Sequence, residues 1–422
     1  MTDSLEFTTG SSDWSLFAAG DCCLDPARRS DDDSLLSPAL HDRVAGADCA
    51  VVNFEAPVRA DGTAGIPKSG PPLENDPAAP TRLADAGFDV AALANNHSMD
   101  YDWESLRRTM TECEQHGLAV CGAGMNRTRA LEPATFEAAG NSVAILNVCE
   151  REFGVARADC PGTAWSSHPD ARKRVRDAAA DFDVVVLVSH GGVEYVPFPS
   201  PERRAQLHEL AEAGADVVVA HHPHVPQGWE VHDGTPIFHS LGNFAFDKMA
   251  DDTATSWGLT VELHFDGDEL VGADLVPTAM VDSVVHELGV ADERDRETHL
   301  DYLHDVADRT STALDAHWQA VAVQTFYRSY SNWLLTGVGH DTAALEAARE
   351  QPHDEATQQD LWDASETTRR EEMLVLLNVL RYEGHRQVMT DALAVLTGEV
   401  ADQRSPEIQI AVDGLLEWTR RE

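Results

Sequence analysis

Residues 217–224 read Val-Val-Val-Ala-His-His-Pro-His, a wholly apolar run that leads directly into three histidines. Continuous runs of β-branched residues are typical of strands that are covered on both faces of a sheet. We therefore predict a buried strand over residues 217–220. In an open α/β sheet, ligands gather at the carboxyl ends of the strands, so these histidines stand where a binding site is expected.

Similar apolar runs recur through the first two thirds of the chain, and helix-like stretches lie between them. The other predicted strands are residues 14–19, 50–52, 90–93, 143–148 and 184–188, and the predicted helices are 79–86, 103–115, 172–180 and 201–213. Alternation of strands and helices predicts an α/β core.

The pattern changes in the last third. Residues 259–265 and 270–276 are expected to form a closing hairpin, and from about residue 284 the spacing of apolar residues is helical. We therefore divide the chain into a catalytic-type domain at 1–283 and a helical region at 284–422. The Pro- and Gly-rich segment 59–80 is expected to be a long loop over the site.

Side chains that can bind metals follow several of the predicted strands. They are Asp21, Asn53, Glu55, Asn95, Asn96, His97, His190, His221, His222 and His224. Carboxylates, neutral imidazoles and amide carbonyls are ligands of borderline divalent metals. Two such metals roughly 3.5–4 Å apart can activate water and clamp a phosphoryl group. An extended segment would point His222 and His224 to the same side, and His221 away from it.

Several motifs occur in an order that resembles the capsule-synthesis (CapA-type) branch of the calcineurin-like metallophosphoesterases. The resemblance covers roughly residues 14–250. It rests on Gly20-Asp21, Asn53-Phe54-Glu55, residues 94–101 (Ala-Asn-Asn-His-Ser-Met-Asp-Tyr), 190–195 (His-Gly-Gly-Val-Glu-Tyr), 221–227 (His-His-Pro-His-Val-Pro-Gln) and 240–244 (Ser-Leu-Gly-Asn-Phe). It implies a four-layer α/β/β/α sandwich, here followed by a C-terminal helical extension.

The resemblance also implies roles for the site residues. Asp21 and His224 would bind one divalent metal, Asn96, His190 and His222 the other, and Glu55 would bridge the two. The metals are expected to be Mn, Fe, Zn or Mg. His97 would be catalytic, donating to a phosphate oxygen or protonating the leaving group. The residues expected to contact substrate or shape the site are Asn53, Asn95, Glu194 and Asn243.

Two positions depart from the wider superfamily pattern. Cys23 stands where a histidine ligand is common, and Glu55 replaces an aspartate. The first metal therefore lacks a ligand, which leaves open whether the site binds one metal or two. Cys23 as a thiolate, or Glu194, can replace it. Lys68 and Arg82 are candidates for an anion-binding loop.

The resemblance implies a metal-dependent phosphoesterase linked to poly-γ-glutamate capsule synthesis, in which metal-activated water is the nucleophile. Two alternatives stay open. One is a non-hydrolytic accessory protein that binds an acidic polymer or a synthase. The other is a hydrolase or transferase of γ-glutamyl amide bonds.

Charge and composition limit the kinds of binding partner and the cellular location that we expect. The chain has 73 acidic against 31 basic residues, a net charge of −42 that argues against nucleic-acid binding. This acidity predicts a halophilic protein whose self-repulsion is screened by salt. No signal peptide and no apolar run long enough for a membrane span is visible, so we expect a cytoplasmic location. Seven cysteines without a C-x-x-C pair favour reduced thiols.

Overall fold

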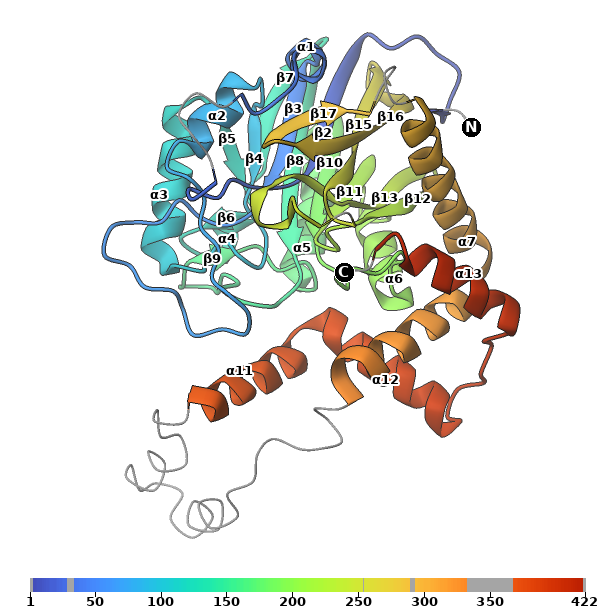
Figure 1. The fold of residues 1–422 in the computed structure, drawn as a ribbon. Helices are drawn as coiled ribbons and strands as arrows, with labels where there is room; N and C mark the ends of the chain where they lie inside the picture. The colour runs from blue at the N-terminus through green and yellow to red at the C-terminus, as the bar shows by residue number, and fades with distance from the viewer. Residues whose placement is uncertain (1–2, 29–33, 253, 289–292, 332–366, 420–422) are drawn as a thin grey trace.

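Two β-sheets packed face to face form the centre of the computed structural model (Figure 1). The structure describes residues 3–28, 34–252, 254–288, 293–331 and 367–419. Within these residues, a nine-stranded sheet has the order β1-β16-β15-β2-β3-β4-β5, with β14 beside β2 and β17 beside β16. A six-stranded sheet has the order β12-β13-β11-β10-β8-β7.

The strands of the larger sheet are β1 (Ser4–Glu6), β2 (Trp14–Cys23), β3 (Cys49–Phe54), β4 (Val90–Ala92), β5 (Ala119–Cys121), β14 (Asn243–Phe246), β15 (Trp257–Asp266), β16 (Glu269–Val281) and β17 (Val284–Glu287). Those of the second sheet are β7 (Ala134–Ala138), β8 (Asn141–Cys149), β10 (Val184–His190), β11 (Val217–His221), β12 (Pro226–His232) and β13 (Thr235–Leu241). A small third pair joins β6 (Ala123–Gly124) to β9 (Gly162–Thr163).

Alternate residues of each central strand belong to different cores, which explains the continuous apolar runs. Leu16 and Ala18 of β2 face the core between the sheets, whereas Phe17 faces the outer core. In β10, Val186 faces the core between the sheets and Leu187 faces the opposite outer layer. Both faces of both strands are therefore covered, as expected for parallel strands in an α/β fold.

Helices complete the outer layers. The larger sheet is covered by α1 (Pro38–Gly46), α2 (Ala79–Asp85) and α3 (Asp102–Gln115), and the smaller one by α4 (Arg127–Ala130), α5 (Pro169–Asp181) and α6 (Pro201–Ala211). The order of layers is thus α/β/β/α, and the predicted α/β class with four layers is confirmed. The predicted helices and strands recur with ends shifted by a few residues.

The C-terminal region begins differently from the expectation. Residues Val284–Glu287 are a strand that pairs antiparallel with β16, so the prediction of helical structure from 284 is wrong for this segment. Pairing with β16 keeps it extended, and its buried Val285 packs with the outer core of the larger sheet. Helical structure in the described residues begins at α7 (Glu293–Thr325).

Helix α7 lies against the sheets, the later helices pack on α7 or on one another, and together they continue the core between the sheets. They are α7, the π-helical turn η2 (Phe326–Tyr330), α11 (Thr367–Arg381), α12 (Glu383–Thr397) and α13 (Pro406–Leu416), and a 3₁₀ turn η1 (Asp247–Met249) lies earlier in the chain. Helix α7 contacts β12 along the side of the smaller sheet (Figure 1). Leu300 and Leu303 of α7 share one hydrophobic cluster with Trp257 of β15.

No helix in the described part of the chain combines the length and the apolar composition that a membrane span requires. All seven cysteines are free thiols, in agreement with the sequence, and six of them are buried.

Candidate metal centre

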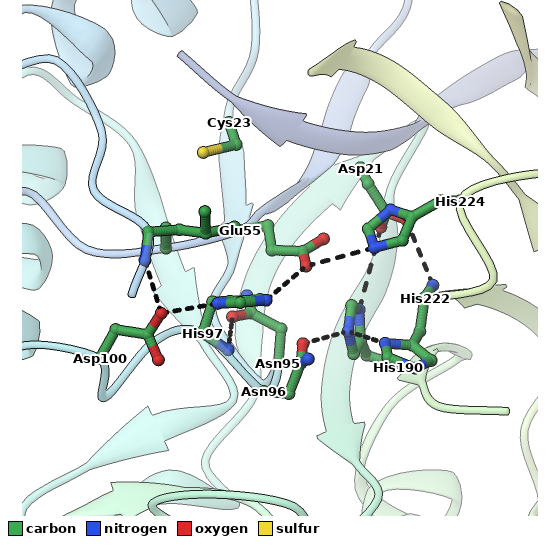
Figure 2. Close-up of polar contacts among 12 residues, drawn as sticks. Asp21, Cys23, Glu55, Asn95, Asn96, His97, Asp100, His190, His222 and His224 are labelled. Atoms are coloured by element: carbon green, nitrogen blue, oxygen red, sulfur yellow. Dashed lines mark hydrogen bonds and ion pairs between the residues drawn. The ribbon is translucent and has the colours of Figure 1, made fainter. Parts of the chain in front are cut away.

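The proposed ligands lie where strands end. Asp21 stands near the end of β2, Glu55 directly follows β3, and His190 is the last residue of β10. Asn96 and the pair His222 and His224 lie in the loops after β4 and β11. Parallel pairing of β2 with β3 and of β10 with β11 aligns the strand ends within each sheet, and the packing of the two sheets brings the side chains of both together (Figure 2).

Two sets of ligand atoms are close enough to hold ions. In the first, one atom each of Asp21, Glu55 and His190 lie within 4.8 Å of one another. In the second, the same holds for Glu194, His222 and His224. The grouping differs from the expected one, because it separates Asp21 from His224 and His190 from His222. Glu194, expected to contact substrate or to replace the missing ligand, belongs to the second group.

Asn96 joins the first set through His190. Its Oδ1 lies 3.0 Å from His190 Nε2, and His222 Nδ1 lies 3.1 Å from the same nitrogen (Figure 2). In the neutral ring, His190 Nε2 is either a donor that carries a proton or an acceptor that carries none. One state of this nitrogen therefore satisfies only one of its contacts with Asn96 and His222. A cation between the three atoms would satisfy them all.

Buried polar atoms without hydrogen-bond partners provide a test of whether these residues fit metals. Glu55 Oε1 and His222 Nε2 are such atoms, and Asn53 Oδ1 beside them is another. A buried polar group left unpaired costs on the order of 1–3 kcal/mol, more when it is charged. Carboxylate and imidazole atoms in this state, packed among further ligand atoms, fit divalent cations.

The pKa shifts of these residues define how protons and a cation compete for the site. Burial, and then the nearby Asp21 carboxylate, raise the pKa of Glu55 well above its usual value. Burial likewise raises the pKa of Asp21. Burial lowers the pKa values of His190 and His222 well below 6.5, and neighbouring histidines lower them further. The imidazoles are therefore neutral ligands, and the carboxylates hold protons that a cation would displace.

The loop after β11 departs from the expected extended form. The strand ends at His221, and His222 and His224 both have positive φ angles, of 101° and 59°. Side chains rarely adopt this region, and such strain concentrates at functional sites. The two histidines thus converge through a turn rather than through strand alternation. His221 was expected to point away, but its Nδ1 lies 3.6 Å from Asp21 Oδ1.

A known protein-family model covers more than half of the chain. The family model described as "Bacterial capsule synthesis protein PGA_cap" matches residues 15–248. The chain belongs to the PGA_cap family.

Relatives and solved structures show how far the likeness extends. The PGA biosynthesis protein CapA of Bacillus subtilis is 35% identical over 170 residues, 39% of this chain and 44% of that protein. The capsule biosynthesis protein CapA of Bacillus anthracis is 32% identical over 234 residues, 53% and 56% of the two chains. The chain thus spans about half the length of these relatives. A 5'-nucleotidase precursor from Thermus thermophilus is similar in structure at a TM-score of 0.42 and 16% identity, covering 69% of this chain and 59% of its own.

In this PGA_cap member, two asparagines contact the ligands and a third holds the loop beside them. Asn53 Nδ2 donates to Asp21 Oδ1 at 2.7 Å and lies 3.2 Å from His190 Nδ1. Asn243 Oδ1 lies 2.9 Å from His224 Nδ1. Asn95 instead donates to the carbonyl of Phe54 and accepts from Ser98 Oγ, so it fixes the loop. Partners that orient metal-binding histidines in this way are as much a part of a metal site as its ligands.

The two candidates for the missing ligand have different surroundings. Glu194 belongs to the second ligand group, together with His222 and His224. Cys23 belongs to none of the groups found in the described residues, and no dashed line reaches it in Figure 2. Burial, and then the Glu55 carboxylate, raise the pKa of the Cys23 thiol well above its usual value, which disfavours a thiolate. The geometry therefore favours Glu194.

His97 is held by two residues whose role the sequence did not reveal. Its Nδ1 lies 2.6 Å from Asp100 Oδ2, and its Nε2 faces Glu55 Oε1 at 3.9 Å (Figure 2). Lys68 Nζ is 2.5 Å from Asp100 Oδ1 and 3.1 Å from His97 Nδ1. Lys68 is therefore bound to the His97–Asp100 pair, and Arg82 lies on α2, outside both ligand groups.

Addition of Mn²⁺ to chelator-treated protein is expected to raise Tm by several degrees at pH 7.5. A ligand present at about 100-fold its Kd stabilises the folded state by about 2.7 kcal/mol. Because the raised pKa of Glu55 lets protons compete with the cation, the shift should shrink as the pH is lowered from 7.5. Thermal melts at several pH values, with and without Mn²⁺, would measure this. A shift equal at all pH values, or absent, would contradict the assignment of these ligands.

Proposed function

We propose that this chain is a metal-dependent hydrolase of phosphoesters that acts in the synthesis or turnover of a capsule-type polymer. One observation carries the proposal: buried carboxylate and imidazole atoms from separate strands converge on one place without satisfying one another. Bound divalent metals supply Lewis acidity and lower the pKa of a coordinated water.

The residues of the chain then have distinct tasks. Asp21, Glu55, Asn96, His190, His222, His224 and Glu194 would hold the metals. His97 lies next to them and is oriented by Asp100, so its Nε2 can hold a proton for the leaving group of the substrate. Asn53 and Asn243 keep Asp21 and His224 in place.

A pocket of about 820 Å³ adjoins the second ligand group at Glu194 and has room for a substrate larger than a phosphate group. Its lining includes Glu194 and Tyr195 from the loop after β10, and Tyr327 and Arg328 from η2. The ring of Tyr195 stacks on His224, with the centroids 5.9 Å apart. The guanidinium of Arg328 adds a positive charge to this lining, which suits a substrate with a second anionic group.

Turnover of p-nitrophenyl phosphate by the chelator-treated protein with added Mn²⁺, in high salt, tests the proposal. We expect release of p-nitrophenol that requires the metal and stops on chelation. Release of glutamate from a γ-linked oligomer, without ester hydrolysis, would instead favour action on γ-glutamyl amide bonds. Tight Mn²⁺ binding without turnover of either substrate would favour an accessory role, the word used in the name of a Mycobacterium tuberculosis relative, "Probable polyglutamine synthesis accessory protein".

A further inference from the structure

The C-terminal helices touch the metal centre, although they lie beyond residues 15–248 that the family model matches. Helix α11 ends at Arg381 and α12 begins at Glu383, so Tyr382 alone separates them. Tyr382 is 3% exposed and lies against the residues that follow β10. The junction of α11 and α12 is therefore part of the wall around the site.

Tyr382 makes two contacts with the centre through different parts of its side chain. Its hydroxyl donates a hydrogen bond to the carbonyl oxygen of Gly192, two residues after the ligand His190. The edge of its ring meets the ring of His222, with the centroids 5.5 Å apart and the planes at 74°. One side chain thus restrains both the loop behind one ligand and the ring of another.

A close approach of α12 to the same loop supports these contacts. A Cβ atom at Gly384 would lie 2.4 Å from the carbonyl oxygen of Gly192, far inside contact distance. Only glycine therefore lets the start of α12 come this near. Gly192 has a φ of 118°, a conformation that side chains rarely adopt, so the loop itself also depends on glycine.

The sandwich holds the same loop from its other side. Arg203 of α6 donates to the carbonyl and to the hydroxyl of Ser189, at 3.1 and 3.0 Å. The backbone N–H of Gly192 donates to Glu150 Oε2 at 3.3 Å. The segment that carries His190 is therefore clamped between the sandwich and the helical region, and Tyr382 supplies a contact from the second of these.

We propose that Tyr382 is a positioning residue of the metal centre, through which the C-terminal helices fix His222 and the loop after His190 for metal binding. This inference rests on the proposed function, because it requires that His222 and His190 bind a metal. Groups that orient metal-binding histidines commonly change metal affinity by about 10–100-fold when removed.

The test is a calorimetric titration of the chelator-treated full chain with Mn²⁺, with Tm measured for every variant. Tyr382→Ala should weaken Mn²⁺ binding by about 10–100-fold. Tyr382→Phe keeps the ring against His222 and loses only the hydroxyl, so it should weaken binding less. Gly384→Ala should weaken binding as well, because it forces α12 away from Gly192.

Matched controls separate this role from a general loss of stability. Trp14 is also a buried aromatic residue that donates to a backbone carbonyl, that of Gly267, but its ring contacts Phe265 and Phe136 rather than a ligand. Trp14→Ala should lower Tm and leave the Mn²⁺ affinity unchanged. Gly414 of α13 has nothing within 4 Å of an added Cβ, so Gly414→Ala should lower neither Tm nor the Mn²⁺ affinity.

Each outcome decides the question. Wild-type affinity in both Tyr382→Ala and Gly384→Ala would overturn the role of Tyr382 while leaving the metal centre intact. Should Tyr382→Ala not fold, Tyr382→Phe and Gly384→Ala decide in the same way. Wild-type protein that binds no Mn²⁺ would instead overturn the proposed function, so the two failures are distinguishable.

Discussion

His190→Ala is expected to lower kcat/KM for p-nitrophenyl phosphate by more than about 100-fold. Removal of a group that only orients a ligand already lowers metal affinity or activity by about 10–100-fold, and loss of a ligand itself should cost more. His190 Nε2 is the atom that lies near both Asn96 and His222, and His190 also belongs to the group with Asp21 and Glu55. The substitution therefore removes a ligand of the first set and the imidazole that contacts His222 of the second set. Steady-state kinetics at saturating and limiting Mn²⁺, together with metal analysis, would measure the effect.

His239→Ala is the matched control for this variant. His239 is buried in β13 of the same sheet, but its Nε2 contacts Glu230, within a group that includes Arg204 and His208, rather than a metal ligand. We expect lower stability in this variant, because a buried carboxylate loses a partner, with Mn²⁺ content near that of the wild type. Equal activity in wild type and His190→Ala would exclude His190 from the reaction.

The sequence predicted the place of the site because strand ends are encoded locally. Val217–Ala220 and the other apolar runs identify covered strands, and the carboxyl ends of parallel neighbours meet at one edge. That rule groups Asp21 with Glu55, and His190 with His222, before any coordinates. The two groups lie on different sheets, so the face-to-face packing of the sheets, which the rule does not contain, brings them together.

Features that depend on long-range packing could not be predicted in this way. The salt bridge of Lys68 with Asp100 joins a loop to the segment after β4, and nothing in the spacing of the two residues indicates it. Residues 284–287 pair with β16 despite the helical pattern that follows them, since pairing with a neighbouring strand overrides local preference. Tyr382 is 160 positions from His222, and only the fold places its ring there.

His97→Asn is expected to lower kcat for phenyl phosphate by about 10²–10⁴-fold, the usual contribution of a positioned acid or base. His97 lies beside the ligand groups without belonging to one, so Mn²⁺ affinity should stay near that of the wild type. Phenolate is a poor leaving group and needs a proton as the ester bond breaks, whereas p-nitrophenolate leaves as an anion. The loss should therefore be much smaller with p-nitrophenyl phosphate.

Asp100→Asn provides the companion measurement, because it keeps the shape of the side chain and removes its charge. Asp100 accepts from His97 Nδ1 and pairs with Lys68, so the amide should leave His97 less firmly oriented and less able to hold a proton. We expect a smaller fall in kcat than in His97→Asn, with the same dependence on the leaving group. Equal losses with phenyl and p-nitrophenyl esters would show that His97 does not protonate the leaving group. Contact with a phosphate oxygen would then account for its effect, because the charge on that oxygen develops whichever phenol departs.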